Sequence, residues 1–126
     1  MRIKSNYLTG IASENYAKIF LKLKGYKIIS NRFKGVKGSS FGEIDIIAEK
    51  KNTIHFIEVK RRKTEIEALE SITPRQQQRI ANTAELFLRK HPKETQNKNC
   101  QFDAIAIYGK GIGKIKHLQN AWLKIN

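Results

Sequence analysis

Residues 41–62, FGEIDIIAEKKNTIHFIEVKRR, hold the strongest structural signal in this chain. Two runs rich in isoleucine and valine, at 42–49 and 53–61, flank a polar turn at residues 50–52. Such a pattern predicts two antiparallel strands joined by a short turn. Acidic side chains are interspersed with the apolar ones, so we expect a hairpin that brings carboxylates close to a buried sheet.

The turn sets which residues of the two strands face each other. If it is symmetric about its centre, Asp45 lies opposite Glu58 and Glu43 lies opposite Lys60, with Cβ atoms about 5 Å apart. Two carboxylates so close in an apolar setting must share a proton, pair with a cation or bind a metal ion such as Mg²⁺. We expect Lys60 to pair with Glu43. An ordinary lattice of cross-strand ion pairs at a sheet edge would show the same short pattern.

The remaining segments predict one α/β domain of residues 1–126. Apolar residues at three- and four-residue steps predict a helix over 6–25 that ends at Gly25. We further expect a strand at 26–34, a loop at 35–40, a helix at 74–90 stopped by His91 and Pro92, a polar loop at 93–100, a strand at 101–109, and a short final strand with a packed end at Trp122 within 113–125. The charged stretch between Arg62 and Pro74 is ambiguous. The order α-β-β-β-α-β predicts a mixed central sheet flanked by helices.

The composition points to a polyanionic partner. Lysine and arginine number 25 against 11 aspartate and glutamate residues, a formal net charge of +14 over 126 residues. Cys100 has no partner for an internal disulfide, and His55, His91 and His117 are scattered, so neither a disulfide nor a zinc cluster is expected. No apolar run approaches the length of about 20 residues that crosses a membrane, so we expect a soluble cytoplasmic protein.

Several motifs, spread over nearly the whole chain, carry a family resemblance. They are TGIASENYA (9–17), GYKIISNRFK (25–34), GEIDIIA (42–48), FIEVKRR (56–62), SITPRQQQRI (71–80) and FDAIAI (102–107). Together they resemble the PD-(D/E)xK nuclease superfamily, which has the restriction-endonuclease-like fold. More closely, the chain is similar to the YraN-like bacterial family of predicted endonucleases, which is related to archaeal Holliday-junction resolvases.

The resemblance implies a role for each matching residue. Asp45 is the aspartate of the motif, Glu58 and Lys60 are its E-x-K, and Ile44 stands where the motif has proline. Phosphodiester hydrolysis needs an activated water and positive charge beside the developing negative charge. Lys60 would orient that water or stabilise the transition state with its compact charge.

The resemblance also implies Mg²⁺ or Mn²⁺ as cofactor. The implied ligands are Asp45, Glu58, the Val59 carbonyl and Glu14, which matches a first-helix glutamate of related nucleases. The residues alone also allow Glu14 to pair with Lys18, four positions along the helix. The implied activity is hydrolysis of phosphodiester bonds in DNA, with branched or damaged DNA among the candidate substrates. The alternative is a catalytically silent nucleic-acid-binding module with the same fold.

Basic and polar residues near these motifs are candidates for contact with nucleic acid. They are Arg32, Lys34, Lys37, Arg61, Arg62, Arg75, Gln77 and Arg79. Gln76 and Gln77 stand where the family usually has Lys-Gln, which removes one expected phosphate contact and leaves Gln77 as a substrate ligand. No base-reading motif accompanies this set, so we expect recognition of the backbone or of DNA structure. A homodimer is expected by analogy with junction resolvases, which cut two strands.

Overall fold

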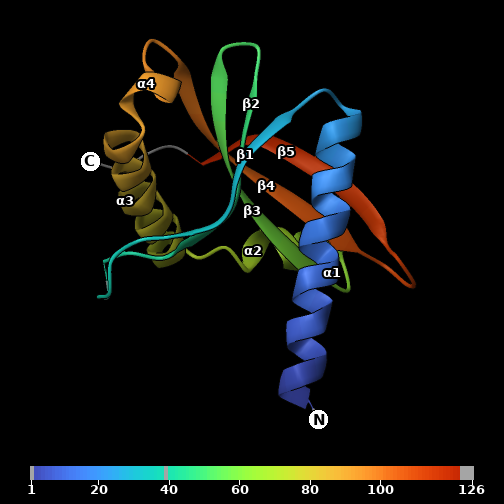
Figure 1. Ribbon diagram of the computed structural model, residues 1–126. Helices are drawn as coiled ribbons and strands as arrows, with labels where there is room; N and C mark the ends of the chain where they lie inside the picture. The colour runs from blue at the N-terminus through green and yellow to red at the C-terminus, as the bar shows by residue number, and fades with distance from the viewer. Residues whose placement is uncertain (1, 39, 123–126) are drawn as a thin grey trace.

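The computed structural model describes residues 2–38 and 40–122, and for residues 2–8 it describes the backbone alone (Figure 1). The elements in chain order are α1 (Arg2–Leu23), β1 (Lys27–Lys34), β2 (Glu43–Lys50), β3 (Thr53–Arg62), α2 (Glu65–Glu70), α3 (Pro74–Lys90), α4 (Pro92–Thr95), β4 (Asn99–Tyr108) and β5 (Lys114–Trp122). The predicted α/β class is confirmed, and the predicted order of elements, including the final strand, holds apart from the two short helices α2 and α4.

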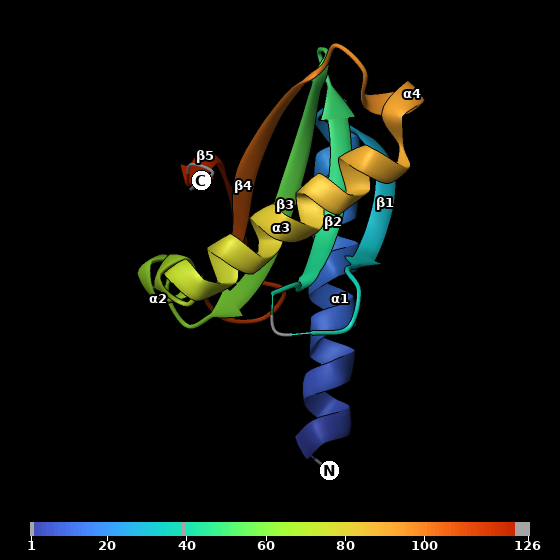
Figure 2. The same cartoon turned by 90° about the vertical axis from the view of Figure 1, so that its left-hand side faces the viewer.

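The five described strands form one sheet in the order β1-β2-β3-β4-β5. β3 and β4 run parallel, whereas the other neighbours run antiparallel, so the sheet is mixed as predicted. A parallel pair needs a crossover connection, which the segment containing α2, α3 and α4 provides. Figure 2 shows α3 crossing one face of the sheet, with α1 behind the opposite face.

The turn between β2 and β3 accounts for the register of the hairpin. Lys51 and Asn52 have φ angles of 49° and 62°, the left-handed pair of a two-residue turn that matches the twist of a hairpin. From this turn the strands pair in the predicted register as far as Ile46 and Ile57. The ladder ends there, so Asp45 lies just beyond it.

Two apolar clusters, one on each face of the sheet, form the core. The α1-side cluster joins Leu21 of α1 to strand residues that include Ile57 and Ile105. The α3-side cluster joins Phe87 of α3 to strand residues that include Phe56. Successive residues of β3 therefore face opposite helices, as the alternation of a regular strand requires.

Thr73 and Pro74 set the start of α3. The Thr73 hydroxyl accepts a hydrogen bond from the backbone N–H of Gln76 at 3.2 Å, and proline in the first turn loses no helical hydrogen bond. The helix ends at Lys90, so the predicted bounds are confirmed. This start places Gln76 in the first turn, from where its side chain reaches β3.

Other boundaries differ from the sequence prediction. α1 begins at Arg2 rather than at residue 6, and α2 occupies the ambiguous stretch between Arg62 and Pro74. α4 and the start of β4 occupy the predicted loop 93–100. β5 is 9 residues long rather than short. Ser39 of the predicted loop 35–40 and residues 123–125 of the predicted tail lie outside the described residues. None of the helices in the described ranges is both long and apolar enough to cross a membrane.

Candidate functional site

The candidate site lies where β2 leaves its ladder with β3. Ile44 belongs to the α3-side cluster and Ile46 to the α1-side cluster, although residues two apart on a regular strand share a face. The alternation therefore breaks at Asp45. Arg32, opposite Asp45 in the register of β1 and β2, has a left-handed φ of 56°, which is uncommon outside glycine. This irregularity gives Asp45 access to both sides of the sheet.

Asp45 and Glu58 form the centre of the site. The backbone N–H of Val59 donates a hydrogen bond to Asp45 Oδ2 at 2.8 Å. Glu58 is 4% exposed, and its Oε2 accepts hydrogen bonds from Gln76 Nε2 at 2.5 Å and from Lys60 Nζ at 3.1 Å. The second oxygen, Glu58 Oε1, is buried and has no hydrogen-bond partner among the described residues. With both carboxyl groups ionised, the centre thus contains an acceptor without a donor, whereas a proton on Asp45 provides a hydrogen bond to Glu58.

Burial disfavours the ionisation of both carboxyl groups. Burial is the largest cause and the charge of Glu58 the second, and together they raise the pKa of Asp45 to about 9. Burial also raises the pKa of Glu58, although the ammonium of Lys60 acts in the opposite direction. The metal-free pair therefore holds a proton at neutral pH, and a bound cation would replace that proton.

Glu14 and Glu43 extend the acidic centre. Carboxylate oxygens of Glu14, Glu43 and Asp45 lie within 4.8 Å of one another. Glu14 also accepts a hydrogen bond from Arg32 Nε at 2.7 Å. The structure thus brings a residue of α1 next to the hairpin carboxylates, as the resemblance implied.

Two predicted ion pairs differ from those in the structure. Lys60 pairs with Glu58 rather than with Glu43, because the side chain of Lys60 lies beside that of Glu58 on the same strand. The alternative partner of Glu14, Lys18, instead donates a hydrogen bond to Asn31 Oδ1 at 3.3 Å. Glu58 and Glu14 therefore each have a basic partner, Lys60 and Arg32 respectively.

Two hollows meet at the carboxylate pair. The first, of about 330 Å³, opens between α1 and β3; the second, of about 350 Å³, opens between β2 and α3. Asp45 and Glu58 line both of them. The other lining residues include Ser13, Glu14, Lys60, Arg61 and Arg62 in the first hollow and Glu43, Gln76 and Arg79 in the second.

The predicted nucleic-acid contacts fall into two groups. One group already has structural bonds: Arg32 to Glu14, Arg61 to Ser13 and Ile112, Gln77 to Ile72, and Arg79 to Phe41. The other group, Lys34, Lys37, Arg62 and Arg75, is exposed, and of these Arg62 also donates to the carbonyl of Arg61. Sequence reasoning selected Gln77 and missed Gln76, which is the glutamine in contact with Glu58. The missing signal was that Gln76 follows the Thr73 cap by three positions and so enters the first turn of α3.

The histidines are less scattered than predicted. His55 and His117 both contact Asp103, on β4, and only His91 lies apart from them. The prediction of isolated histidines was therefore wrong for this pair. No pattern in the sequence connects two residues so far apart, because their meeting depends on the order of the strands.

The fold and site define a class: an α/β protein with a mixed five-stranded sheet and a buried acidic pair where its central hairpin opens. A model of the uncharacterised protein family UPF0102 matches residues 13–107. This range includes Glu14, Asp45, Glu58 and Lys60. The chain belongs to this family.

Relatives in several bacteria agree with that assignment. A UPF0102 protein of Rhodopseudomonas palustris (strain BisB18) is 39% identical over 116 residues, which cover 92% of this chain and 81% of that protein. One from Bradyrhizobium diazoefficiens is 41% identical over 101 residues, with coverage of 80% and 72%. One from Paramagnetospirillum magneticum is 36% identical over 113 residues, with coverage of 90% and 85%.

Proposed function

We propose that this chain is a metal-dependent endonuclease of the PD-(D/E)xK superfamily that hydrolyses phosphodiester bonds in DNA. One observation carries the proposal: Asp45 and Glu58 are adjoining buried acids where two hollows meet, and Glu58 Oε1 has no donor among the described residues when both acids are ionised. An unpaired buried acceptor and two adjoining acids both lower stability. A divalent cation bound between them would remove both penalties.

The donor set suits a small, hard cation. The carboxylate residues Asp45, Glu58 and Glu14 line the first hollow together with Val59, and oxygens of Asp45 and Glu14 lie within 4.8 Å of each other. Ligands of this kind favour Mg²⁺ or Mn²⁺ over softer metals. Such an ion, when bound, acts as a Lewis acid toward the phosphate and lowers the pKa of a bound water.

Lys60 and Gln76, which both donate to Glu58 Oε2, would have different roles. The Lys60 ammonium is 21% exposed and faces the first hollow, where it can orient a water molecule or stabilise negative charge on the phosphate. Gln76 holds Glu58 Oε2 from α3. This bond fixes the orientation of the Glu58 carboxylate and so acts as a positioning contact.

The basic rim of the site suits a nucleic-acid backbone. Arg62 is exposed and lines the first hollow; Arg75, also exposed, directly precedes Gln76, which lines the second. The chain has a net charge of +14. Contacts to phosphate give affinity without sequence information. We therefore favour a substrate recognised by its shape, such as branched or damaged DNA.

A cleavage assay tests this proposal. The protein is incubated with branched, single-stranded and duplex DNA in Mg²⁺, in Mn²⁺ and in EDTA. We expect cleavage that requires the metal, with a loss on the order of 10³-fold or more for Asp45→Ala and for Lys60→Ala. Binding to DNA, measured in parallel, should persist in both variants.

Lys27→Ala is the matched control for Lys60→Ala, because Lys27 is exposed at the far end of β1. It removes the same charge and should leave cleavage unchanged. Cleavage that survives Asp45→Ala would point to another site or to a contaminant. Binding to every substrate without cleavage of any would identify the chain as a silent binding module.

A further inference from the structure

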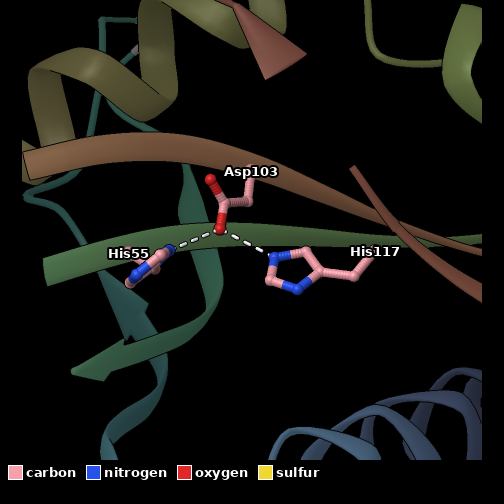
Figure 3. Close-up of side chains that lie close together, drawn as sticks. All are labelled: His55, Asp103 and His117. Atoms are coloured by element: carbon pink, nitrogen blue, oxygen red, sulfur yellow. Dashed lines mark hydrogen bonds and ion pairs between the residues drawn. The ribbon is translucent and has the colours of Figure 1, made fainter. Parts of the chain in front are cut away.

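A second polar cluster lies on the other face of β3 from Glu58. His55 Nδ1 is 2.6 Å and His117 Nε2 is 2.7 Å from the same oxygen, Asp103 Oδ2. Figure 3 shows both rings directed at this carboxylate from opposite sides. The three side chains come from the adjacent strands β3, β4 and β5 and are 5%, 0% and 9% exposed for His55, Asp103 and His117. The sheet therefore gathers three potential metal ligands in a buried position.

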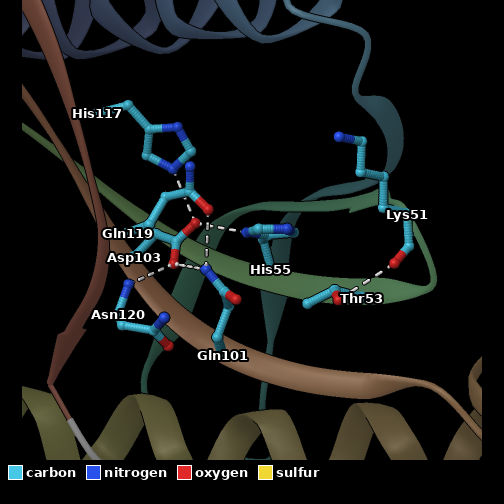
Figure 4. A network of polar contacts seen from close by, with 8 residues as sticks. All are labelled: Lys51, Thr53, His55, Gln101, Asp103, His117, Gln119 and Asn120. Carbon is cyan, nitrogen blue, oxygen red and sulfur yellow. Dashed lines mark hydrogen bonds and ion pairs between the residues drawn. The ribbon is translucent and has the colours of Figure 1, made fainter.

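An irregularity in β5 completes the cluster. The register of β4 and β5 shifts between Phe102 and Ala104, and Asn120 has a left-handed φ of 53° there. This shift lets the backbone N–H of Asn120 donate to Asp103 Oδ1 at 3.1 Å, and Gln101 Nε2 donates to the same oxygen at 2.9 Å (Figure 4). Hydrogen bonds to one oxygen of a carboxylate fix the orientation of the group as a ligand. Because these two donors bind Oδ1, Oδ2 remains available to the histidines.

The ligand chemistry differs from that of the Asp45 site. Two imidazole nitrogens and one carboxylate oxygen, all within 4.8 Å of one another, form a set that Zn²⁺ prefers and Mg²⁺ does not. A hollow of about 250 Å³ beside His55 is lined by Tyr26, Gln101 and Gln119 among others. It borders the cluster at His55, the side from which a water molecule would approach as the fourth ligand.

We propose that His55, Asp103 and His117 form a Zn²⁺ site that joins β3, β4 and β5. The proposal is independent of the nuclease activity, which uses different residues. The ion would bind through His55 Nδ1, His117 Nε2 and Asp103 Oδ2, and it would tie the edge strand β5 to the centre of the sheet.

Zinc must displace the hydrogen bonds of the metal-free cluster. Both nitrogens that face Asp103 carry hydrogen while they donate to its carboxylate, so each hydrogen must leave to solvent or move to the other ring nitrogen. Ligands around a tetrahedral Zn²⁺ lie about 3.3 Å apart, so the contacts of 2.6 and 2.7 Å must open by about 0.6–0.7 Å. Lys50 is a cation that lines the hollow beside His55. Its Nζ lies 5.0 Å from the centre of the Tyr26 ring and donates a hydrogen bond to the Lys24 carbonyl.

Zinc titration against a chromophoric chelator tests the site. The protein is used without a histidine tag, in an Asp45→Asn, Cys100→Ser background that removes the acidic centre and the exposed thiol. We expect one equivalent of Zn²⁺ to bind, and His117→Gln to weaken binding by at least about a hundredfold. His91→Gln, the matched control, should bind as before, because His91 contacts Phe87 instead.

Two further measurements need no variant of the cluster. Zinc at about a hundred times its Kd should raise Tm by about 10 °C. In ¹⁵N spectra of the histidine rings, zinc should shift Nδ1 of His55 and Nε2 of His117 and leave both His91 nitrogens in place. Absence of binding, binding that His117→Gln leaves intact, or shifts confined to His91 would each overturn the proposal in favour of a purely hydrogen-bonded network.

Discussion

Asp103 and the pair of Asp45 with Glu58 are buried acids in one sheet, yet their environments differ sharply. Asp103 is fully buried and accepts hydrogen bonds from both histidines, Gln101 and Asn120. Burial alone would raise the pKa of Asp103, but these donors outweigh it and lower the pKa well below its ordinary value. In the pair, burial raises the pKa of both groups, and the charge of Glu58 raises that of Asp45 further.

The number of hydrogen-bond donors, rather than burial, therefore sets the protonation state of these buried acids. The carboxylate of Asp103 is saturated and so contributes to the folded structure. At the pair, Glu58 Oε1 has no partner among the described residues. A carboxylate left open in this way costs stability in the absence of a ligand, which is typical of a functional centre.

Replacement of Asp103 should have the largest effect on stability. Asp103→Asn puts an amide group where four donors converge, so we expect a loss of about 3–5 kcal/mol in the free energy of unfolding. Urea denaturation of the metal-free protein measures it. Glu49→Gln, which breaks the partly exposed pair with Lys98, is the control and should cost less than about 1 kcal/mol. Equal losses in the two variants would show that Asp103 is not a structural centre.

Replacement of Asp45 should act in the opposite direction. The asparagine of Asp45→Asn still accepts from Val59 and donates from its amide to Glu58, without the repulsion between two acids. We expect a gain of about 1–2 kcal/mol in the free energy of unfolding at pH 8 in EDTA, measured by urea denaturation. A loss of stability would mean that the wild-type pair is not strained.

The pH dependence of stability should separate the two acids. The pKa of Asp45 is raised from 3.8 to about 9. The contribution of its protonation to the free energy of unfolding is therefore full below pH 3.8 and is lost as the pH rises toward 9. Because the pKa of Asp103 is lowered from 3.8, its contribution is present above that pH and is lost on acidification. We expect wild type in EDTA to lose stability from pH 5 to 9, by less than about 1.4 kcal/mol per unit. Asp45→Asn should flatten this slope, and an unchanged slope would assign it to other groups.

Replacement of the exposed basic residues Arg62 and Arg75 at the rim of the site should have the smallest effects. Arg62→Gln and Arg75→Gln should each weaken DNA binding and reduce its salt dependence by about one unit in the slope of log K against log salt. Fluorescence anisotropy at several salt concentrations measures this slope, with Lys27→Gln as the control. A control that changes the slope equally would mean that the charge of the whole chain, and not the rim, binds DNA.

Much of the fold and part of the site could be predicted from the sequence, for identifiable reasons. The short turn at Lys51 and Asn52 fixed the register of the hairpin, and the proximity of Asp45 to Glu58 follows from it. The Thr73 and Pro74 signals fixed the start of α3. Turn and helix-capping signals of this kind can be predicted because they depend on residues adjacent in the sequence.

Other features depend on contacts that no local pattern records. The break in alternation at Asp45 arises from its pairing with β1, where Arg32 takes a left-handed conformation. The cluster around Asp103 joins residues 48 and 14 positions away in the sequence. α2 is only 6 residues long and buries Ala68 alone, so its helical periodicity is too short to detect.

Calorimetric titration of Mn²⁺ tests most directly whether the open acidic pair is a metal centre. Wild type and Asp45→Asn are compared at pH 7 in two buffers of different ionisation enthalpy, which reveals the protons released. The account predicts that wild type binds Mn²⁺ and releases a proton, and that Asp45→Asn binds at least about a hundredfold more weakly without that release. Equal affinity in the two proteins, or binding to neither, would contradict it.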